Sequence, residues 1–113
     1  MIYKIQTDSL TEDSQRKLEH FIKITRDLNK YAQALQKEMI IEISGHSDTT
    51  GEEHFNKEIS LHRANKIGDI FTKNQFNETQ LVLYGMGSTV TRNENISASE
   101  KRRVEIEILF KND

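Results

Sequence analysis

The sequence predicts an α/β sandwich in which helices cover one face of a four-stranded mixed sheet. Two stretches, 12–37 and 55–73, carry apolar residues at steps of three and four, which is typical of amphipathic helices. Four shorter runs alternate apolar and polar residues, as half-buried strands do. The resulting order is strand, helix, strand, helix, strand, strand. The chain has 113 residues, enough for one compact domain and too few for two, so we expect a single domain over residues 1–113.

The N-terminal third predicts one strand and one long helix. Residues 2–6 (IYKIQ) form the first expected strand. Residues 7–9 (TDS), which follow it, are of types that favour turns and helix caps. Thr11 and the acidic residues that follow it are suited to cap a helix from about residue 12 to 37, with a break near Asn29. The expected buried face of this helix consists of Leu18, Phe21, Ile22, Thr25, Leu28, Ala32, Leu35 and Met39.

The middle of the chain predicts a strand, a polar loop and a second helix. Residues 39–44 alternate in the strand pattern, and Gly45 ends the run. The polar segment 46–54 (HSDTTGEEH) reads as a loop that turns at Gly51. The helix expected over 55–73 has an apolar face made of Phe55, Ile59, Ala64, Ile67, Ile70 and Phe71.

The C-terminal third predicts two further strands joined by a polar loop. The first spans residues 80–84 and ends at the Gly-Met-Gly run 85–87, and the loop covers residues 88–100. The last strand is expected over residues 101–110. One of its faces should carry Val104, Ile106, Ile108 and Phe110.

Composition excludes several classes of function. With 16 basic and 18 acidic residues the formal net charge is −2, which gives no electrostatic footprint for nucleic acid or anionic lipid. The chain has no cysteine, which excludes thiol catalysis and cysteine-ligated metals. No apolar run reaches the roughly 18 residues that a membrane span needs. The opening residues lack the basic start and apolar stretch of a signal peptide.

The loop after the second strand contains residue types that occur in metal sites and catalytic triads. The potential metal ligands are His46, Asp48, Glu52, Glu53 and His54, with His20 and His62 elsewhere on helices. None has the HExxH spacing that places ligands on one helix face, so a solvated polar loop is the simpler interpretation and we expect no metal and no cofactor. Ser47 lies between a histidine and an aspartate, but sequence neighbours rarely adopt triad geometry and no GxSxG elbow is present.

One pair of charged residues points to a specific ligand chemistry. Asp48 opens the loop at the carboxyl end of a strand, and Arg63 follows 15 residues later in the next helix. A loop that folds back over the start of the helix would bring both charged side chains to the edge of the same candidate site. Such a pair matches a ligand that carries both an ammonium and a carboxylate group. The alternative, which spacing alone favours, is an intramolecular salt bridge between Asp48 and Arg63.

A set of separated motifs resembles the OmpA-like peptidoglycan-binding domain, and the match covers residues 40–110 closely. The motifs are Gly45-His46-Ser47-Asp48-Thr49-Thr50-Gly51, Asn56, Ile59-Ser60-Leu61-His62-Arg63-Ala64, Gly85-Met86-Gly87, Asn95 and Arg102-Arg103-Val104-Glu105-Ile106. The family includes C-terminal domains of OmpA-type porins, peptidoglycan-associated lipoproteins and stator proteins of the MotB type. Its strand and helix order agrees with the order predicted above, and its members are not enzymes.

The resemblance implies noncovalent binding of the cell wall through diaminopimelate in the stem peptide of peptidoglycan. It implies that Asp48 accepts a hydrogen bond from the ammonium group of diaminopimelate. Arg63 would then bind the carboxylate of the same residue. The expected function is to anchor a membrane protein or complex to the wall of a Gram-negative cell.

The resemblance also implies supporting roles around these two charges. Asn56 would contact the ligand or brace the loop, and backbone N–H groups around Thr49, Thr50 and Gly51 would receive further carboxylate oxygens. Arg102 matches the first arginine of the family's NRR motif and would brace Asp48 or touch the ligand.

The chain departs from the family pattern at three positions, and the changes at Lys4 and Lys101 together with a long first helix support an alternative function. Ser47 stands where threonine is usual, Lys101 replaces an asparagine, and Lys4 lies where the first strand usually carries an acid. The first helix also looks about two turns longer than is usual. The alternative is a protein-interaction or oligomerisation module, such as a homodimer, that keeps the fold without the ligand.

The resemblance places the domain in the periplasm. We expect it to be excised from a longer protein that is tethered to the outer or inner membrane by another segment.

Overall fold

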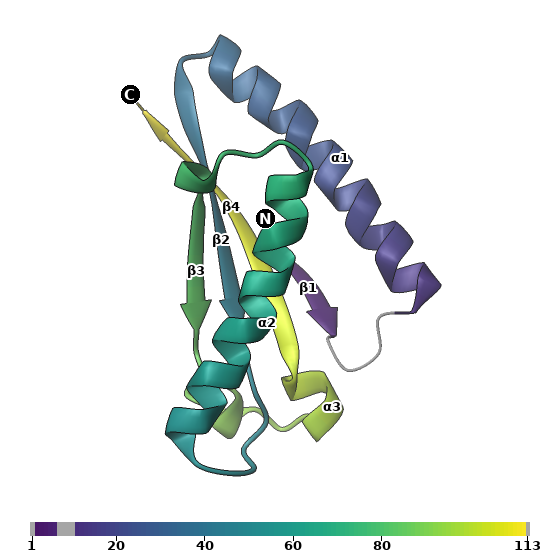
Figure 1. The fold of residues 1–113 in the computed structure, drawn as a ribbon, viewed down its shortest axis with the longest axis vertical. Helices are drawn as coiled ribbons and strands as arrows, with labels where there is room; N and C mark the ends of the chain where they lie inside the picture. Colours follow the sequence, from purple (N-terminus) through teal and green to yellow (C-terminus); the bar gives the residue numbers. More distant parts are fainter. Residues whose placement is uncertain (1, 7–10, 113) are drawn as a thin grey trace.

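The computed structural model describes residues 2–6 and 11–112, and the expected turn at residues 7–9 lies outside this range. The predicted order of strands and helices is confirmed (Figure 1). The main elements are β1 (Ile2–Gln6), α1 (Glu12–Ala34), β2 (Lys37–Gly45), α2 (Glu53–Lys73), β3 (Leu81–Gly85) and β4 (Arg103–Asn112). The connections contain three short helical turns, η1 (Glu78–Gln80), η2 (Thr91–Asn93) and α3 (Ala98–Lys101). None of the described helices is long and apolar enough to cross a membrane.

The strands form one mixed sheet in the order β1-β4-β2-β3. β4 runs antiparallel to both of its neighbours, whereas β2 and β3 are parallel. Ile43 in the centre of β2 lies opposite Ile106 on one side and Leu83 on the other. The alternating pattern of β2 and β4 therefore places their apolar side chains on the same face of the sheet.

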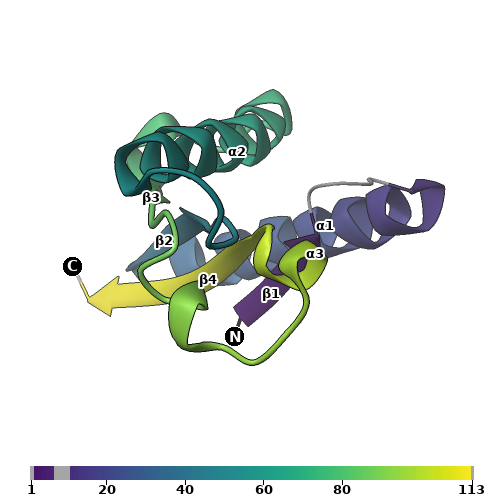
Figure 2. The same ribbon diagram turned by 90° about the horizontal axis from the view of Figure 1, so that it is seen from below.

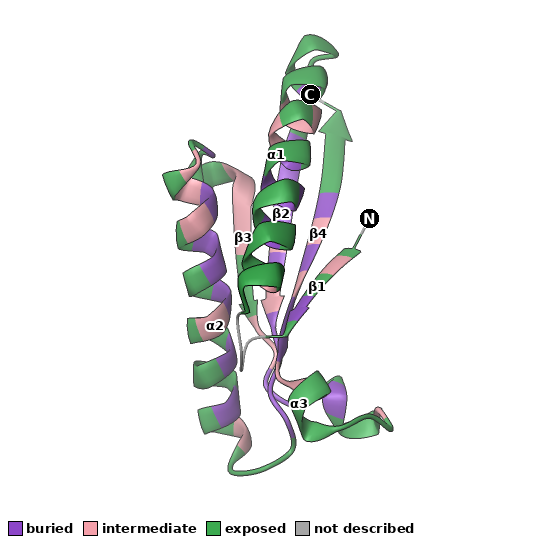
Figure 3. Cartoon of the chain, turned by 90° about the vertical axis from the view of Figure 1, so that its right-hand side faces the viewer, coloured by how far each residue is buried: buried purple, intermediate pink, exposed green. Residues whose placement is uncertain are grey.

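Both long helices pack on this apolar face, as predicted. Figure 3 shows the buried stripe of α2 turned toward the sheet, and Figure 2 shows α2 on the opposite side of β4 from the loop that contains α3. The core combines every second residue of the strands, those on the covered face, with residues from both helices. Its members include Leu18, Phe21, Ile22, Met39, Ile41, Ile43, Ala64, Ile67, Phe71, Val104, Ile106 and Ile108.

The first helix differs from its prediction at its C-terminal end. Thr11 caps its start, because its hydroxyl oxygen accepts a hydrogen bond from the Ser14 N–H at 3.1 Å. The helix passes Asn29 without a break and ends at Ala34, three residues before the predicted end. The chain reverses at Gln36, whose φ of 56° is left-handed, and enters β2 at once. Leu35, predicted to be in the core, is therefore 68% exposed.

The second helix begins at Glu53, two residues before the predicted start, and buries a different face at that end. Phe55 and Ile59 were expected in the core, but they are exposed, and Asn56 and Ser60 are buried in their place. The cause is close contact between backbones. A Cβ atom on Gly45 would lie 1.8 Å from the carbonyl oxygen of Ser60, so only small side chains fit between this part of α2 and the sheet.

The two C-terminal strands begin slightly later than predicted. β3 starts at Leu81, after Asn77 has capped the short helix η1. β4 starts at Arg103 because Ala98–Lys101, which spans the end of the predicted loop and the first residue of the predicted strand, forms a helical turn. β4 continues to Asn112, and its C-terminal end extends past α2 (Figure 1). Phe110, predicted on the apolar face, is 49% exposed.

Candidate functional site

A cavity of about 360 Å³ lies where the chain leaves β2 and enters α2. It is formed by the loop after Gly45, the N-terminal half of α2 and the residue that precedes β4. Its lining residues are Ser47, Asp48, Thr50, Gly51, Glu52, Phe55, Asn56, Ile59, Arg63 and Arg102. Six of the seven residues predicted for the ligand site are therefore brought together. The seventh, Thr49, is exposed on the same loop and does not line the cavity.

Asp48 is a buried carboxylate that the loop holds in place. One oxygen, Oδ1, accepts hydrogen bonds from the Thr50 N–H at 2.9 Å and the Thr50 hydroxyl at 2.5 Å. The other, Oδ2, forms an ion pair with Arg102 Nη1 at 2.5 Å. The Thr50 hydroxyl, the Thr50 N–H and Arg102 together lower the pKa of Asp48 to about 2, although burial opposes them. Asp48 is thus ionised at neutral pH.

Arg63 reaches the same cavity from α2 without pairing with Asp48. Its Nη1 donates a hydrogen bond to the backbone oxygen of His46 at 3.3 Å. The predicted alternative, a salt bridge between Asp48 and Arg63, is wrong: in the described residues Asp48 pairs with Arg102, and Arg63 forms no ion pair. The reason is that Arg102 approaches Asp48 from the far end of the chain, a contact that local spacing does not reveal.

Gly51 and Asn56 shape the floor of the cavity. Gly51 adopts a φ of 83°, which is the turn that the sequence predicted for this loop and which side-chain-bearing residues rarely adopt. Asn56 is buried in the first turns of α2, and its Oδ1 atom lies 3.8 Å from the position of a Cβ on Gly51. The amide side chain of Asn56 therefore lies against the turn at Gly51.

The cavity also has an apolar wall that the sequence analysis assigned to the core. Phe55 and Ile59 are 56% and 44% exposed and line the cavity beside Arg63. These three residues stand four apart along α2, so they share one helix face. The sequence could have predicted this wall. Once Arg63 is assigned to the site, helical spacing places Ile59 and Phe55 on the same helix face, so they should also border the site.

Backbone and side-chain contacts fix the loop against the segment that follows β3. The Ser47 N–H donates to the oxygen of Gly87 at 2.9 Å, and the Thr91 hydroxyl donates to the oxygen of Ser47 at 2.6 Å. Glu53, at the start of α2, accepts hydrogen bonds from the N–H and hydroxyl of Ser88. The Ser88 hydroxyl is the main reason why the pKa of Glu53 is lowered. The position of Asp48 is therefore set by contacts on both sides of its loop.

The alternative chemistries receive no geometric support. The Ser47 hydroxyl donates to the backbone oxygen of Asp48 rather than to a histidine. The His46 ring is buried, with Nε2 at 3.3 Å from Glu105 Oε2, and burial lowers its pKa. Within residues 2–6 and 11–112, no three histidine or acidic side chains are placed to hold a metal ion. The Gly-Met-Gly segment ends β3 in a turn, where Gly85 lets α2 approach closely.

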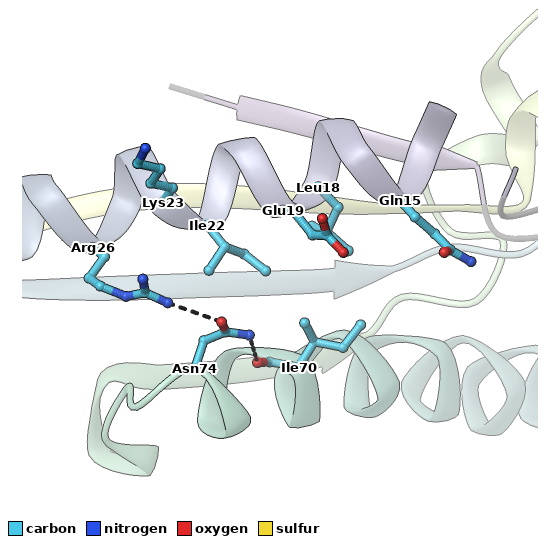
Figure 4. A pocket seen from close by; sticks show the side chains of 8 residues that line it. All are labelled: Gln15, Leu18, Glu19, Ile22, Lys23, Arg26, Ile70 and Asn74. Carbon is cyan, nitrogen blue, oxygen red and sulfur yellow. Dashed lines mark hydrogen bonds between the residues drawn. The ribbon is translucent and has the colours of Figure 1, made fainter. Parts of the chain in front are cut away.

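A larger cavity of about 610 Å³ lies between α1 and α2 and contains none of the predicted site residues (Figure 4). Arg26 of α1 donates to Asn74 Oδ1 at 3.0 Å, and the Asn74 side chain donates to the oxygen of Ile70 at 2.7 Å. These contacts link α1 to the C-terminal end of α2. They account for Arg26, one of three charged residues that line this cavity, as a connection between helices. The smaller cavity, which contains the predicted residues, is therefore the better candidate site.

Comparison with known proteins gives a family match over nearly the whole chain. The sequence profile of the OmpA family matches residues 2–105. Outer membrane protein A from Buchnera aphidicola subsp. Schizaphis graminum is 31% identical over 85 residues, which are 65% of this chain. The match spans about a quarter (24%) of the length of that relative.

Solved structures share the same fold. The periplasmic domain of Helicobacter pylori MotB superposes with a TM-score of 0.70 at 23% identity, over 95% of this chain and 80% of that domain. The OmpA-like domain of FopA1 from Francisella tularensis gives 0.74 at 15% identity, over 98% and 72%. The peptidoglycan-associated lipoprotein from Burkholderia pseudomallei gives 0.65 at 16% identity, over 96% and 89%.

Proposed function

Because the chain belongs to the OmpA family, we propose that it binds cell-wall peptidoglycan noncovalently, through diaminopimelate in the stem peptide. OmpA-like domains are binding modules rather than enzymes. The observation that carries the proposal is one cavity that holds an ionised buried carboxylate, Asp48, and an arginine with no ion pair among the described residues, Arg63. Opposite charges at two fixed points match a ligand that is a zwitterion.

The hydrogen-bonding capacity of Asp48 leaves room for an ammonium group. An ionised carboxylate offers about four lone-pair directions. Thr50 occupies two of them and Arg102 one. The remaining direction can accept a hydrogen bond from the ammonium group at the D-centre of diaminopimelate.

Arg63 is the proposed partner of the ligand carboxylate. Within residues 2–6 and 11–112 one of its N–H groups is used, in the hydrogen bond to His46, and the planar guanidinium group keeps further donors for a bidentate contact. The Thr50 N–H is already bound to Asp48. Additional backbone donation to the ligand therefore falls to Gly51, which lines the cavity, rather than to Thr49, which does not.

Arg102 and Asn56 are proposed to support the two charges. Arg102 balances the negative charge of Asp48 when no ligand is present, which lowers the free-energy cost of burying that carboxylate. Asn56 holds the turn at Gly51 from below. The exposed faces of Phe55 and Ile59 can pack against the methylene chain that joins the two ends of diaminopimelate.

We expect a single stem peptide to bind weakly. Each charge-assisted hydrogen bond contributes roughly 1.5–3 kcal/mol, and ordering the flexible peptide offsets much of the total. The resulting Kd is on the order of 10 μM to 1 mM. The wall presents many copies of the same peptide, so a tethered protein would be held by avidity.

The proposed location follows from the proposed ligand. We place this domain in the periplasm as the wall-binding part of a longer, membrane-anchored protein. The similar proteins include an outer membrane protein, a peptidoglycan-associated lipoprotein and the periplasmic domain of MotB, which support an envelope location.

A sedimentation assay with insoluble diaminopimelate-type peptidoglycan tests the proposal. Wild type should sediment with the wall, whereas Asp48→Ala and Arg63→Ala should stay in solution while circular dichroism shows that they are folded. Asp69→Ala and Arg16→Ala serve as charge-matched controls because both positions are exposed and lie outside the cavity. Folded wild-type protein that stays in solution would contradict the proposed ligand and favour a protein-interaction module.

A further inference from the structure

The segment that joins β3 to β4 packs against the loop that joins β2 to α2 (residues 46–52, the binding loop). Both segments lie at the same end of the sheet (Figure 1). Thr91, the first residue of the turn η2 in the β3–β4 segment, is 0% exposed and does not line the cavity that holds Asp48. Its hydroxyl group is therefore placed to act on the binding loop rather than on a ligand.

Two hydroxyl groups hold the peptide groups on either side of Asp48. The Thr91 hydroxyl donates to the backbone oxygen of Ser47 at 2.6 Å, which holds the peptide group that precedes Asp48. The Ser47 hydroxyl donates to the backbone oxygen of Asp48 at 2.9 Å, which holds the peptide group that follows it. Peptide groups are planar, so fixing both of them sets the direction in which the Asp48 side chain leaves the backbone.

Ser47 depends on Thr91 for the position of its carbonyl group. The Ser47 N–H donates to the backbone oxygen of Gly87 at 2.9 Å, so both backbone polar groups of Ser47 are bonded to the β3–β4 segment. Ser47 is only 4% exposed, which leaves its carbonyl oxygen little access to water. Without the Thr91 hydroxyl this buried oxygen would lose its donor, and the present position of the binding loop would become less favourable.

A buried ion pair holds the segment that carries Thr91. Arg103 is 5% exposed, and its Nη1 and Nη2 atoms donate to the two carboxylate oxygens of Glu94 at 2.8 and 3.1 Å. The Glu94 N–H in turn donates to the backbone oxygen of Thr91 at 3.0 Å. Arg103 begins β4 directly after Arg102, the ion-pair partner of Asp48. The segment with Thr91 is thus tied to the same strand end that presents Arg102.

We propose that Thr91 is a positioning residue of the ligand site: its hydroxyl group sets the place of the Asp48 carboxylate relative to Arg63 without touching the ligand. This role rests on the proposed function, in which one ligand contacts both charges. Thr91 lies 44 residues from Ser47 in the sequence, so the spacing of motifs does not reveal the contact.

Two substitutions at Thr91 separate the hydroxyl group from the rest of the side chain. Thr91→Val removes the donor and keeps the volume nearly unchanged, whereas Thr91→Ser keeps the donor and loses a methyl group. In calorimetric titration with a diaminopimelate stem peptide, we expect Thr91→Val to bind about fivefold more weakly and Thr91→Ser to stay within about twofold of wild type. Wild-type affinity in Thr91→Val, or equal weakening in both variants, would overturn the role of the hydroxyl group.

Thr25 offers a matched control for the loss of a buried hydroxyl group. It is also 0% exposed, and its hydroxyl donates to the backbone oxygen of Phe21 at 2.8 Å, within α1. Thr25→Val should leave the affinity for the peptide unchanged, whatever its effect on stability. If Thr25→Val weakened binding as much as Thr91→Val, general loosening of the fold would explain both results and the positioning role would fail.

Titration of Asp48 in the absence of ligand distinguishes this role from the proposed function. The pKa of Asp48 is lowered from 3.8 to about 2, mainly by the hydrogen bond from the Thr50 hydroxyl and further by Arg102. These contacts require the carboxylate in its present place, so Thr91→Val should raise the pKa toward 3.8 and Thr91→Ser should not. The carboxyl carbon signal of Asp48, followed from pH 6 downward in folded protein, reports this pKa.

The two readouts together decide between the possible failures. A raised Asp48 pKa in Thr91→Val, combined with a wild type that does not bind the peptide, would reject the proposed ligand and keep the role of Thr91 in placing the carboxylate. An unchanged pKa in Thr91→Val would overturn the positioning role, even if wild type binds the peptide.

Discussion

At the scale of single residues, the account depends on the different surroundings of Asp48 and Arg63. Asp48 is buried, ionised and held by three hydrogen-bond donors, whereas Arg63 uses one donor to fix its position and keeps its charge for the cavity. If Arg63 binds the ligand carboxylate through two N–H groups, the planar shape of its guanidinium group should matter for binding as well as its charge.

The substitution Arg63→Lys tests this geometry. Lysine keeps the charge but loses the planar fork that binds a carboxylate through two N–H groups. We expect binding of a diaminopimelate stem peptide to weaken about tenfold, equivalent to roughly 1.4 kcal/mol, when measured by calorimetric titration. Wild-type affinity in this variant would contradict the assigned role of Arg63.

The pH dependence of stability tests the state of Asp48. Its pKa is about 2 in the folded protein against an ordinary value of 3.8, so the folded state favours the ionised form. Asp48 therefore contributes stability that is present above the ordinary pKa and is lost as pH falls toward 2. The free energy of unfolding should differ between wild type and Asp48→Asn at pH 6, and that difference should shrink between pH 4 and pH 2. A difference that stays constant with pH would show that the carboxylate charge is not what the loop stabilises.

At the scale of elements, the N-terminal half of α2 determines the shape of the site. Close approach of this helix to Gly45 and Gly85 turns Asn56 and Ser60 inward and leaves Phe55, Ile59 and Arg63 on the cavity side. Close contact at these two glycines thus controls which face of α2 borders the cavity.

The substitution Gly45→Ala should disrupt this arrangement. The new methyl group would lie 1.8 Å from the Ser60 oxygen, which is backbone and cannot move aside without shifting the helix. We expect a loss of about 3 kcal/mol, at the upper end of overpacking costs, in chemical denaturation. Gly68→Ala is the comparison, because the nearest atom there belongs to the Leu83 side chain at 3.2 Å and can yield. Equal losses at both glycines would contradict the proposed role of backbone contact.

The apolar wall of the cavity gives a prediction that separates binding from folding. Phe55 is 56% exposed, so Phe55→Ala should change the free energy of unfolding by no more than about 0.5 kcal/mol. The same substitution should weaken binding of the stem peptide several-fold, because the ligand chain loses an apolar contact. Phe71→Ala, at a buried position of the same helix, should instead destabilise the fold by about 3–5 kcal/mol. Unchanged peptide affinity in folded Phe55→Ala would remove the wall from the proposed site.

At the scale of the whole molecule, local patterns predicted the sheet and the order of elements. Alternation in β2 and β4 is visible in the sequence because one face of the sheet is buried and the other is open. The C-terminal end of α1 was less visible, since the chain reverses at a glutamine rather than at the glycine or proline that usually marks a helix end.

The residues of the candidate site were predictable, and so, through the family resemblance, was the contact between Arg102 and Asp48, but periodicity and spacing alone did not give the contacts. The motifs around Asp48 and Arg63 indicated the correct region, and six of the seven predicted positions line one cavity. The pair formed by Asp48 and Arg102 joins residues 54 apart in the sequence, and the inward face of α2 depends on Gly45. Both result from packing between distant segments, which periodicity and spacing do not encode.

The central claim concerns where one ligand binds, so mapping its position is the most direct test. Isotope-labelled wild-type protein would be titrated with a stem peptide that contains diaminopimelate, and with one that contains lysine in its place. We expect the first peptide to shift the amide signals of residues 47–51, the cavity face of α2 from Phe55 to Arg63, and Arg102. The lysine peptide, which lacks one carboxylate, should shift them only at much higher concentration. Equal affinity for both peptides, or shifts confined to another surface, would contradict the account.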